Sequence, residues 1–379
     1  MSIGPRPVYF AGADLVSTHG DGIDAAARAC LEGAVHRQTI TLPNLEAGIS
    51  LPFCGMTDAR APYEHLRSTV STALAQSGIN PRQRQRTGLF VGTSSGDIAL
   101  HEQRYAEEAA TTGIAIAIRH PYHGEMAQWL AREFRIEGPC FTFSTACSAS
   151  ANALLYASWM IRERRIDHAL IVGVEFQNRV SLMGFNSMLL IARSGACRPF
   201  DATREGIVLG EAIAATVLSA RPESPPRWQL SGGASLCDAA HPTNPAPEQI
   251  ARTIELALND AGIVTGDVTA IKAHGTGTSS NDLGEGLGMR RAFDDRPPPF
   301  TSIKPVVGHT LGACGVVETL IMQRCLDQGQ LPPTAGFVHP DPLLAIAPVT
   351  AIHAVAAGPV LLNFFGFGGN NCSLVMTPC

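Results

Sequence analysis

Cys147 stands among small residues, in the segment 143–150, between an expected strand and an expected helix. A thiol at such a turn lies near backbone N–H groups and the positive end of the helix, which stabilise a thiolate and lower its pKa. The same N–H groups can donate hydrogen bonds to the oxyanion that forms when an acyl group is bound there. Cys147 is therefore a candidate nucleophile, although its position alone favours a buried cysteine that packs like an alanine.

His274 opens the sequence His-Gly-Thr-Gly-Thr, which follows an expected strand. The glycines leave the imidazole open to a cavity, and Thr276 and Thr278 add hydroxyl groups to the same loop. Glycines and threonines alternating in this way are unusual in a hydrophobic core. A histidine with a purely structural role is the alternative, and these residues alone do not decide between the two.

Lys304 and His309 lie five residues apart on a Gly-rich loop that enters an expected helix. Glu318 follows nine residues after the histidine, inside that helix. A lysine beside a histidine raises the cost of protonating the imidazole and so helps to keep it neutral. The alternative interpretation of Lys304 is a solvated surface charge.

The segment 363–371 alternates glycine with phenylalanine after an expected buried strand. Glycine gives such a segment conformational freedom, so Phe365 and Phe367 are expected on a flexible aromatic loop. A loop of this kind suits a gate over a hydrophobic tunnel. A Gly-rich turn whose phenylalanines cap the core is the alternative.

Short apolar runs that end in glycine alternate with helical patterns along the chain, which predicts an α/β layered fold with a sheet covered on both faces. Residues 221–226 resemble a linker. On either side of them the order of strands, polar loops and helix-opening turns is similar, and this weak repeat predicts a duplicated architecture with halves at 1–220 and 221–379. The expected helices are 23–32, 62–77, 124–134, 150–164, 247–261, 282–293 and 314–327.

Composition excludes several classes of protein. Charged residues make up 16% of the 379 residues, below the ~25% of a typical soluble chain, and the net charge is −5. No basic block occurs, so we expect no nucleic-acid partner. No signal peptide and no long apolar run are found, so we expect a cytoplasmic protein without a membrane partner. The ten cysteines form no C-x-x-C pair, and we expect neither a metal site nor a cofactor.

Together, and in this order, the segments resemble those of the β-ketoacyl synthases of the thiolase superfamily, specifically the elongating kind that uses one cysteine and two histidines. The resemblance extends over nearly the whole chain. It rests on 145–148 as the nucleophile turn, on 198–201 with 204–206 and 210–211, on 274–278, on Lys304 with 308–309, and on 363–371.

The resemblance implies a thiolase-like duplicated fold, layered α-β-α-β-α with two mixed five-stranded sheets. It also implies the family's two-step condensation. Cys147 would take an acyl group from an acyl carrier protein as a thioester, and a malonyl carrier protein would then lose CO2 and attack that thioester. His274 and His309 would donate hydrogen bonds to the enolate oxygen. Lys304 would tune this pair of histidines.

Further roles follow from the same resemblance. Glu318 would order the loop and the water around the histidines. The backbone N–H groups of Cys147 and Phe365 would form the oxyanion hole. Phe365, with Phe367, would act as the gate between the two half-reactions, and Thr276 and Thr278 would be supporting residues of the site.

Partners and pathway also follow from the resemblance. It implies an acyl carrier protein as partner and either a homodimer or a heterodimer with a related ketosynthase-like subunit. Departures from the family pattern include Ser150 for a common glycine, Cys314 for an alanine and Phe364 for a serine, and the segment 97–139 is abbreviated relative to the housekeeping enzymes. These departures favour a specialised pathway, of the type II polyketide or aryl-polyene-like kind, over core fatty-acid synthesis.

Three other functions fit these residues less well. A non-catalytic chain-length partner subunit normally lacks the nucleophile, whereas Cys147 is present. An acyl hydrolase or transferase with a Cys-His pair explains neither the second histidine nor Lys304. A degradative thiolase needs a second cysteine in a C-x-G-type loop, and Cys372 lacks that setting.

Overall fold

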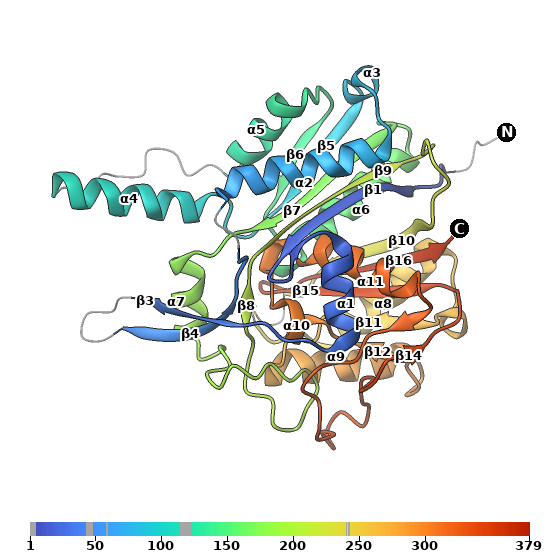
Figure 1. Ribbon diagram of the computed structural model, residues 1–379. Helices are drawn as coiled ribbons and strands as arrows, with labels where there is room; N and C mark the ends of the chain where they lie inside the picture. The colour runs from blue at the N-terminus through green and yellow to red at the C-terminus, as the bar shows by residue number, and fades with distance from the viewer. Residues whose placement is uncertain (1–4, 43–47, 58–59, 114–122, 240, 242) are drawn as a thin grey trace.

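Strands and helices alternate along the part of the chain that the structure describes, which is residues 5–42, 48–57, 60–113, 123–239, 241 and 243–379 of a computed structural model (Figure 1). The elements up to residue 219 are β1 (Tyr9–Ser17), β2 (Gly20–Asp21), α1 (Ile23–Glu32), β3 (Gln38–Leu42), β4 (Ile49–Cys54), α2 (Pro62–Ser77), α3 (Pro81–Arg84), β5 (Thr87–Gly92), α4 (Ile98–Thr112), α5 (Glu125–Phe134), β6 (Cys140–Phe143), the 3-10 helix η1 (Ala146–Ser148), α6 (Ala149–Arg162), β7 (His168–Glu175), α7 (Arg179–Ser187), β8 (Leu209–Gly210) and β9 (Ala212–Ser219).

The later elements follow a similar order. They are β10 (Trp228–Cys237), α8 (Pro247–Ala261), η2 (Thr265–Asp267), β11 (Ala270–Lys272), α9 (Ser279–Ala292), β12 (Phe300–Thr301), α10 (Lys304–Val307), η3 (Leu311–Ala313), α11 (Cys314–Leu326), β13 (Gln330–Leu331), β14 (His353–Ala354), β15 (Val360–Gly366) and β16 (Asn370–Pro378).

The main sheet has the strand order β12-β11-β15-β16-β10-β1-β9-β7-β5-β6. Its two ends mirror each other: β5 pairs parallel with β6 and β7, and β11 pairs parallel with β12 and β15. The central strands pair antiparallel. The two expected five-stranded sheets are therefore present, and one register pair, Tyr9 with Gln229 on β1 and β10, joins them into a continuous path.

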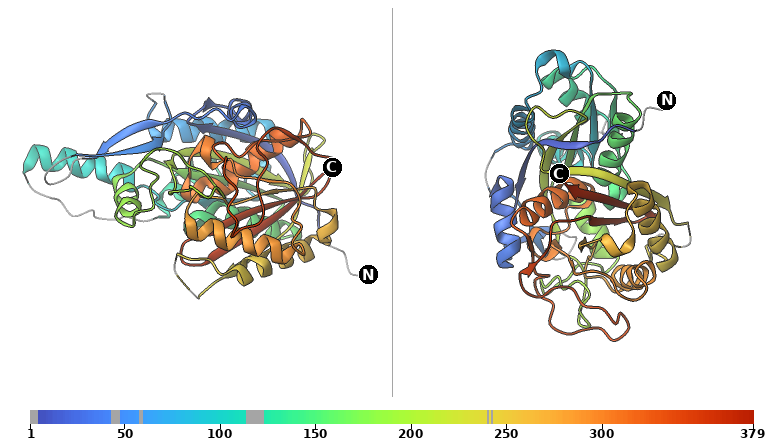
Figure 2. Two further views of the ribbon diagram at one scale, coloured as in Figure 1. Left: turned by 90° about the horizontal axis from the view of Figure 1, so that it is seen from below. Right: turned by 90° about the vertical axis from the view of Figure 1, so that its right-hand side faces the viewer.

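Two buried helices form the central layer. α6 contacts β5 and β7 on one side and β10 and β16 on the other, and it packs against α11. Close packing is visible at Gly315, where an added Cβ would lie 2.1 Å from the backbone nitrogen of Ala151. α2 covers β1 and β9 outside the first sheet, and α8 covers β10 and β16 outside the second. Figure 2 shows α2 and α5 at one end of the molecule and α8 with α9 at the other, which completes the expected layers.

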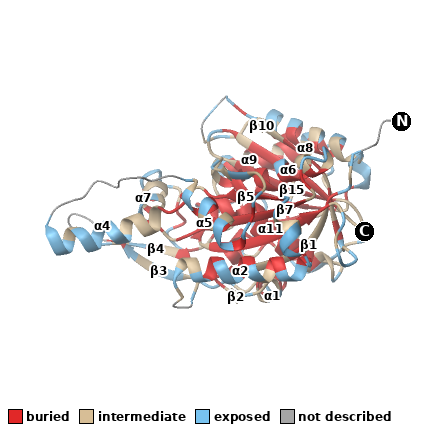
Figure 3. Ribbon diagram, turned by 90° about the horizontal axis from the view of Figure 1, so that it is seen from above, coloured by how far each residue is buried: buried red, intermediate tan, exposed pale blue. Residues whose placement is uncertain are grey.

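Most expected helices begin and end within a few residues of their predicted bounds. The helix α4 (Ile98–Thr112) was not predicted, because its apolar residues do not mark out a core-facing stripe. It projects from the body, and no residue along it is buried (Figures 1 and 3). Among the described residues, no helix is long and apolar enough to cross a membrane.

Candidate functional site

The nucleophile turn joins β6 to α6. Ala146, the first residue of the short 3-10 helix η1, adopts a left-handed conformation with φ 49°, a sparsely populated region for a residue with a Cβ. Hydrogen bonds hold the turn: Ser148 Oγ donates to the Thr145 carbonyl at 2.8 Å, and Asn152 Nδ2 donates to Thr145 Oγ1 at 2.9 Å. The strained turn places Cys147 at the start of the central helix, where it is buried.

The thiol of Cys147 lies 3.0 Å from His309 Nε2, so the two atoms are within hydrogen-bond distance. Burial raises the pKa of this thiol to about 11, although Lys304 and the backbone N–H of Phe367 lower it. The lowered pKa expected from the turn alone was wrong, because desolvation of the thiolate outweighs the nearby donors. The resting site therefore holds a neutral thiol.

His309 is placed by a second turn of the same design. Leu311, the first residue of the 3-10 helix η3, has φ 42°, and α11 begins at Cys314. The backbone of His309 pairs with the chain near β8: its N–H donates to Val208 at 2.8 Å, and its carbonyl accepts from Gly210 at 3.0 Å. These bonds hold the imidazole against the thiol from the opposite side of the α6–α11 layer.

His274 follows β11, and carboxylates from α9 hold its loop. Glu285 accepts hydrogen bonds from the N–H groups of His274 and Gly275, at 2.6 and 2.7 Å. Asp282 accepts from the N–H of Thr276 at 3.0 Å. Burial raises the pKa of Glu285 to about 7. The rings of His274 and His309 meet edge to face at 5.4 Å.

Both histidines are buried and have a pKa well below the ordinary value. Burial is the main cause, and the positive charge of Lys304 lowers both values further. The Nδ1 atoms of both rings have no hydrogen-bond partner among the described residues. A neutral imidazole carries one N–H donor and one acceptor, so each ring can both donate and accept a proton.

Lys304 is not a solvated surface charge. Its Nζ lies 2.6 Å from Glu318 Oε1, and both side chains are buried. A second lysine, Lys272, contacts the other oxygen of the same carboxylate at 2.5 Å. Sequence reasoning missed Lys272, because a lysine inside a short apolar strand carries no signal of burial. It could have been found as the charged residue two positions before His274 in an otherwise apolar run.

The glycine–phenylalanine segment is only partly a loop. Phe365 belongs to β15, opposite Asn371 on β16, and is buried with its ring 6.0 Å from that of His274. Phe367 follows the strand, and its ring stacks on that of Phe185 at 5.7 Å. The backbone N–H that acts on the Cys147 thiol is that of Phe367, not of Phe365 as expected. Because β15 continues to Gly366, the N–H that is free to act on the thiol is that of Phe367, two residues after Phe365.

Two further groups complete the surroundings of the thiol. Cys314 Sγ donates to the Cys147 carbonyl at 2.9 Å, which gives this cysteine a structural contact. Glu175, at the end of β7, accepts hydrogen bonds from the N–H groups of Ser94 and Gly312, at 2.8 and 3.0 Å. Glu175 thus ties the loop after β5 to the His309 turn.

A narrow cavity opens onto these groups. The cavity is lined by the thiol, by both histidine rings, by both threonines of the His-Gly-Thr-Gly-Thr loop, and by Phe365 and Phe367. The full lining is Cys147, Phe185, Ile207, His241, Thr243, Pro245, His274, Thr276, Thr278, Asn281, His309, Phe365, Gly366, Phe367 and Gly369. The structure therefore brings the predicted site residues to one cavity, with Lys304 and Glu318 behind it.

One ligand atom each from Cys147, His274 and His309 lies within 4.8 Å of the others. Three potential ligand atoms this close together could also hold a metal ion. Metal-binding histidines donate their second ring nitrogen to a carboxylate or carbonyl, whereas both Nδ1 atoms here lack a partner among the described residues. The donor set fits proton transfer at a thiol better than it fits a metal.

Comparison with known proteins decides the family. The model of the β-ketoacyl synthase N-terminal domain matches residues 63–224, and that of the β-ketoacyl synthase C-terminal domain matches residues 229–338. The chain belongs to the β-ketoacyl synthase family. These are condensing enzymes of the acyltransferase class, and the predicted family and thiolase-like fold are confirmed.

Individual relatives come from both fatty-acid and polyketide pathways. The chain is 29% identical to 3-oxoacyl-[acyl-carrier-protein] synthase I, chloroplastic, of Hordeum vulgare, over 77% of this chain and 67% of the relative. It is also 29% identical to the tetracenomycin polyketide synthase ketoacyl synthase alpha subunit of Streptomyces glaucescens, over 80% and 78%. A solved structure of the ishigamide ketosynthase/chain length factor matches with a TM-score of 0.90, 25% identity and 99% of both chains. This β-ketoacyl synthase therefore has a role in polyketide or fatty-acid biosynthesis.

Proposed function

We propose that this β-ketoacyl synthase joins an acyl group held on Cys147 to a malonyl group by decarboxylative Claisen condensation, with both groups delivered by acyl carrier protein. The observation that carries the proposal is the cavity in which a thiol meets two neutral imidazoles. A nucleophile, a general base and two hydrogen-bond donors are the parts that acyl transfer and enolate formation need.

The first half-reaction is acyl transfer. His309 Nε2 lies 3.0 Å from the Cys147 thiol and takes its proton as sulfur attacks the incoming thioester carbonyl. A thiol with a pKa of about 11 needs such a base near neutral pH. The backbone N–H groups of Cys147 and Phe367 stabilise the oxyanion. The carbon–sulfur bond to the carrier then breaks, and the carrier thiol leaves with the proton.

The second half-reaction is decarboxylation and condensation. The malonyl carboxylate leaves as CO2, and the electron pair passes to an enolate whose oxygen accepts hydrogen bonds from His274 and His309. Both imidazoles must be neutral here, since two imidazolium groups in a buried site would be costly, and Lys304 favours that state. The enolate carbon attacks the Cys147 thioester, forms the new carbon–carbon bond and releases the thiolate.

We propose that Phe367 is the moving part of the gate and that Phe365 is its fixed base. Phe367 is half-buried on the segment after β15, whereas Phe365 is held in the sheet. Thr276 and Thr278, whose hydroxyl groups lie 2.9 Å apart, line the cavity and can hydrogen-bond the carrier's thioester arm. Glu318 supports the site from behind through Lys304.

We propose that the chain works as a dimer, with a second copy or with a related ketosynthase-like subunit. β6 forms one edge of the main sheet, and Phe141 on it and Tyr156 on α6 are each 45% exposed. Edge strands with exposed aromatic side chains are a liability unless a partner covers them. The low charge of the chain agrees with a covered apolar face. The likeness to a ketosynthase/chain length factor structure supports the heterodimeric form.

We also propose the finer assignments that remain predictions from the sequence. The halves 1–220 and 221–379 are duplicated units, the first carrying the thiol and the second carrying both histidines. The mirrored strand order supports this division. The pathway is a specialised one of the polyketide or aryl-polyene-like kind, and the enzyme acts in the cytoplasm.

The test is a condensation assay in which acyl and malonyl carrier proteins are mixed with the enzyme and the products are followed by intact mass. We expect β-ketoacyl carrier protein from the wild type and none above background from Cys147→Ala. Circular dichroism and thermal unfolding check that the variant is folded, because a buried thiol resembles an alanine in volume. Product formation by the folded Cys147→Ala variant would contradict the proposal.

A further inference from the structure

Lys272 and Lys304 are the only lysines in the sequence; the other side chains among the 28 Lys and Arg residues are arginines. Both lysines are buried, and both contact Glu318. Arginine occupies all the remaining cationic positions. Lysine is thus kept at only two sites, and these two sites share one carboxylate. Arginine and lysine differ in shape and hydrogen bonding, so this choice has a physical reason at each site.

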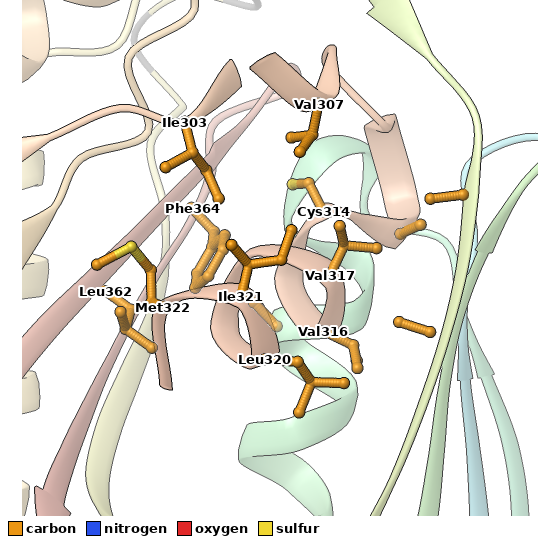
Figure 4. Packing of buried hydrophobic residues seen from close by; sticks show 14 of the residues in the cluster. Ile303, Val307, Cys314, Val316, Val317, Leu320, Ile321, Met322, Leu362 and Phe364 are labelled. Atoms are coloured by element: carbon orange, nitrogen blue, oxygen red, sulfur yellow. The ribbon is translucent and has the colours of Figure 1, made fainter. Parts of the chain in front are cut away.

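The surroundings of Lys272 match the three N–H donors of an ammonium group. Its Nζ lies 2.5 Å from Glu318 Oε2 and 2.6 Å from the Asn363 carbonyl oxygen. The ring centroid of Phe364 lies 3.6 Å from the same nitrogen, within range of a cation–π contact. Figure 4 shows Phe364 packed beside α11, next to Ile321. A planar guanidinium would not fit these three directions.

Glu318 is held symmetrically. One carboxylate oxygen contacts Lys272 and the other contacts Lys304, at 2.5 and 2.6 Å. A buried charge is tolerated only when it is paired, and removal of one partner leaves an uncompensated charge. The three side chains therefore form one unit with an excess of positive charge, and losing Lys272 frees one oxygen of Glu318.

Lys272 is also connected to His274. It ends β11 two residues before the histidine, so the strand sets the position of both. Its partner Asn363 donates a hydrogen bond from Nδ2 to Glu285 Oε1 at 3.4 Å. Glu285 in turn accepts from the backbone N–H of His274. A continuous set of contacts thus links Lys272 to the histidine backbone.

We propose that Lys272 is a positioning residue for the condensation: it holds Glu318 from the side opposite Lys304 and supplies a second buried positive charge that keeps His274 and His309 neutral. This inference rests on the proposed function. It adds a residue to the machinery behind the cavity and gives it a role that acts through the histidines.

The charged and titratable groups around the two rings come from several elements. They are Cys147 on η1, Glu175 on β7, Lys272 on β11, Glu285 on α9, Lys304 on α10, and Cys314 with Glu318 on α11. Both lysines lower the pKa of both histidines. Burial lowers the pKa of Lys272 itself. For Lys304 burial acts the same way, but Glu318 together with Cys314 and Cys147 more than offsets it, so the pKa is raised. Lys272 is therefore the more easily neutralised member of the pair.

The first test is the pH profile of malonyl decarboxylation in Lys272→Met, which keeps the length of the side chain and removes its charge. Activity needs neutral histidines and falls as the pH drops through their pKa. Without Lys272 that pKa rises, so the acid limb moves to higher pH. Ile321→Val is the matched control, because it perturbs the same buried cluster without changing charge.

Three outcomes separate the hypotheses. A folded Lys272→Met variant with a wild-type pH profile would overturn the positioning role. A uniform loss of activity at all pH values, with no shift of the limb, would show a merely structural role and would also overturn it. Wild-type enzyme that makes no condensation product would instead contradict the proposed function, since that failure does not depend on Lys272.

The second test uses the wild type and does not depend on whether the variant folds. Because the chain has two lysines, labelling with lysine enriched in 13C at Cε gives two resonances that report directly on the two ammonium groups. We expect both to keep their proton throughout the pH range in which the enzyme is active. A resonance that titrates within that range would mean that one lysine is uncharged during catalysis, and the second-charge role of Lys272 would fail.

Discussion

The nucleophile turn and the His309 turn have the same backbone design. In each, a left-handed residue with a side chain, Ala146 or Leu311, opens a short 3-10 helix that leads into a buried central helix. The two helices, α6 and α11, pack against each other, so the two turns face one another and bring Cys147 to within 3.0 Å of His309. Two similar turns thus build one site from opposite sides.

Two buried carboxylates near these turns are held in different ways. Glu175, which ties the loop after β5 to the His309 turn, is held by backbone N–H groups, those of Ser94 and Gly312 among them. Glu318, on α11, is held instead by two buried ammonium groups. The difference shows that the backbone repeats while the charges do not: positive charge is concentrated beside the histidines, where it keeps them neutral.

The largest effects should come from replacing the histidines, which lie on the side of the site where the positive charge is concentrated. We expect His274→Ala to lower malonyl decarboxylation by about 10²-fold or more while Cys147 is still acylated, because this ring does not contact the thiol. His309→Ala should impair both half-reactions, since its Nε2 contacts Sγ. Decarboxylation and acylation measured separately check this. Equal effects of the two variants on acylation would contradict the assignment.

Smaller effects, on the free energy of unfolding, are expected when the two buried glutamates, Glu318 and Glu175, are replaced. Glu318→Gln leaves two buried ammonium groups without their counter-charge, and we expect a loss of about 3–5 kcal/mol in the free energy of unfolding. Glu175→Gln keeps an acceptor oxygen for the backbone donors, and the loss should be about 1–3 kcal/mol. Denaturant unfolding of both variants measures the difference. A greater loss for Glu175→Gln would contradict the account of where charge is concentrated.

Much of the fold was predictable from the sequence, for a local reason. Strands that end in glycine before a polar loop, and helices that open at small-residue turns, follow from backbone sterics that act over a few residues. The segments around Cys147, His274 and His309 were recognised by their order along the chain, which resembles that of a known family, and the structure brings their side chains to one cavity.

The features that were missed depend on contacts between distant segments. Nothing in the sequence of β11 distinguishes Lys272. Its role is visible only in the folded chain, where Glu318 and Asn363 contact its ammonium group. The pKa of Cys147 was expected to fall, but burial by both halves raises it. The donor N–H belongs to Phe367 because the pairing of β15 with β16 continues to Gly366, which the glycine pattern does not reveal.

The most direct test of the central claim is to locate the acyl group after the enzyme is incubated with acyl carrier protein alone. Trypsin releases residues 136–162 as one peptide, which holds both Cys147 and the exposed Cys140. Fragment masses should place the acyl group on Cys147, and Cys140→Ser should leave the yield unchanged. Acylation at Cys140, or acylation that persists in Cys147→Ala, would contradict the account.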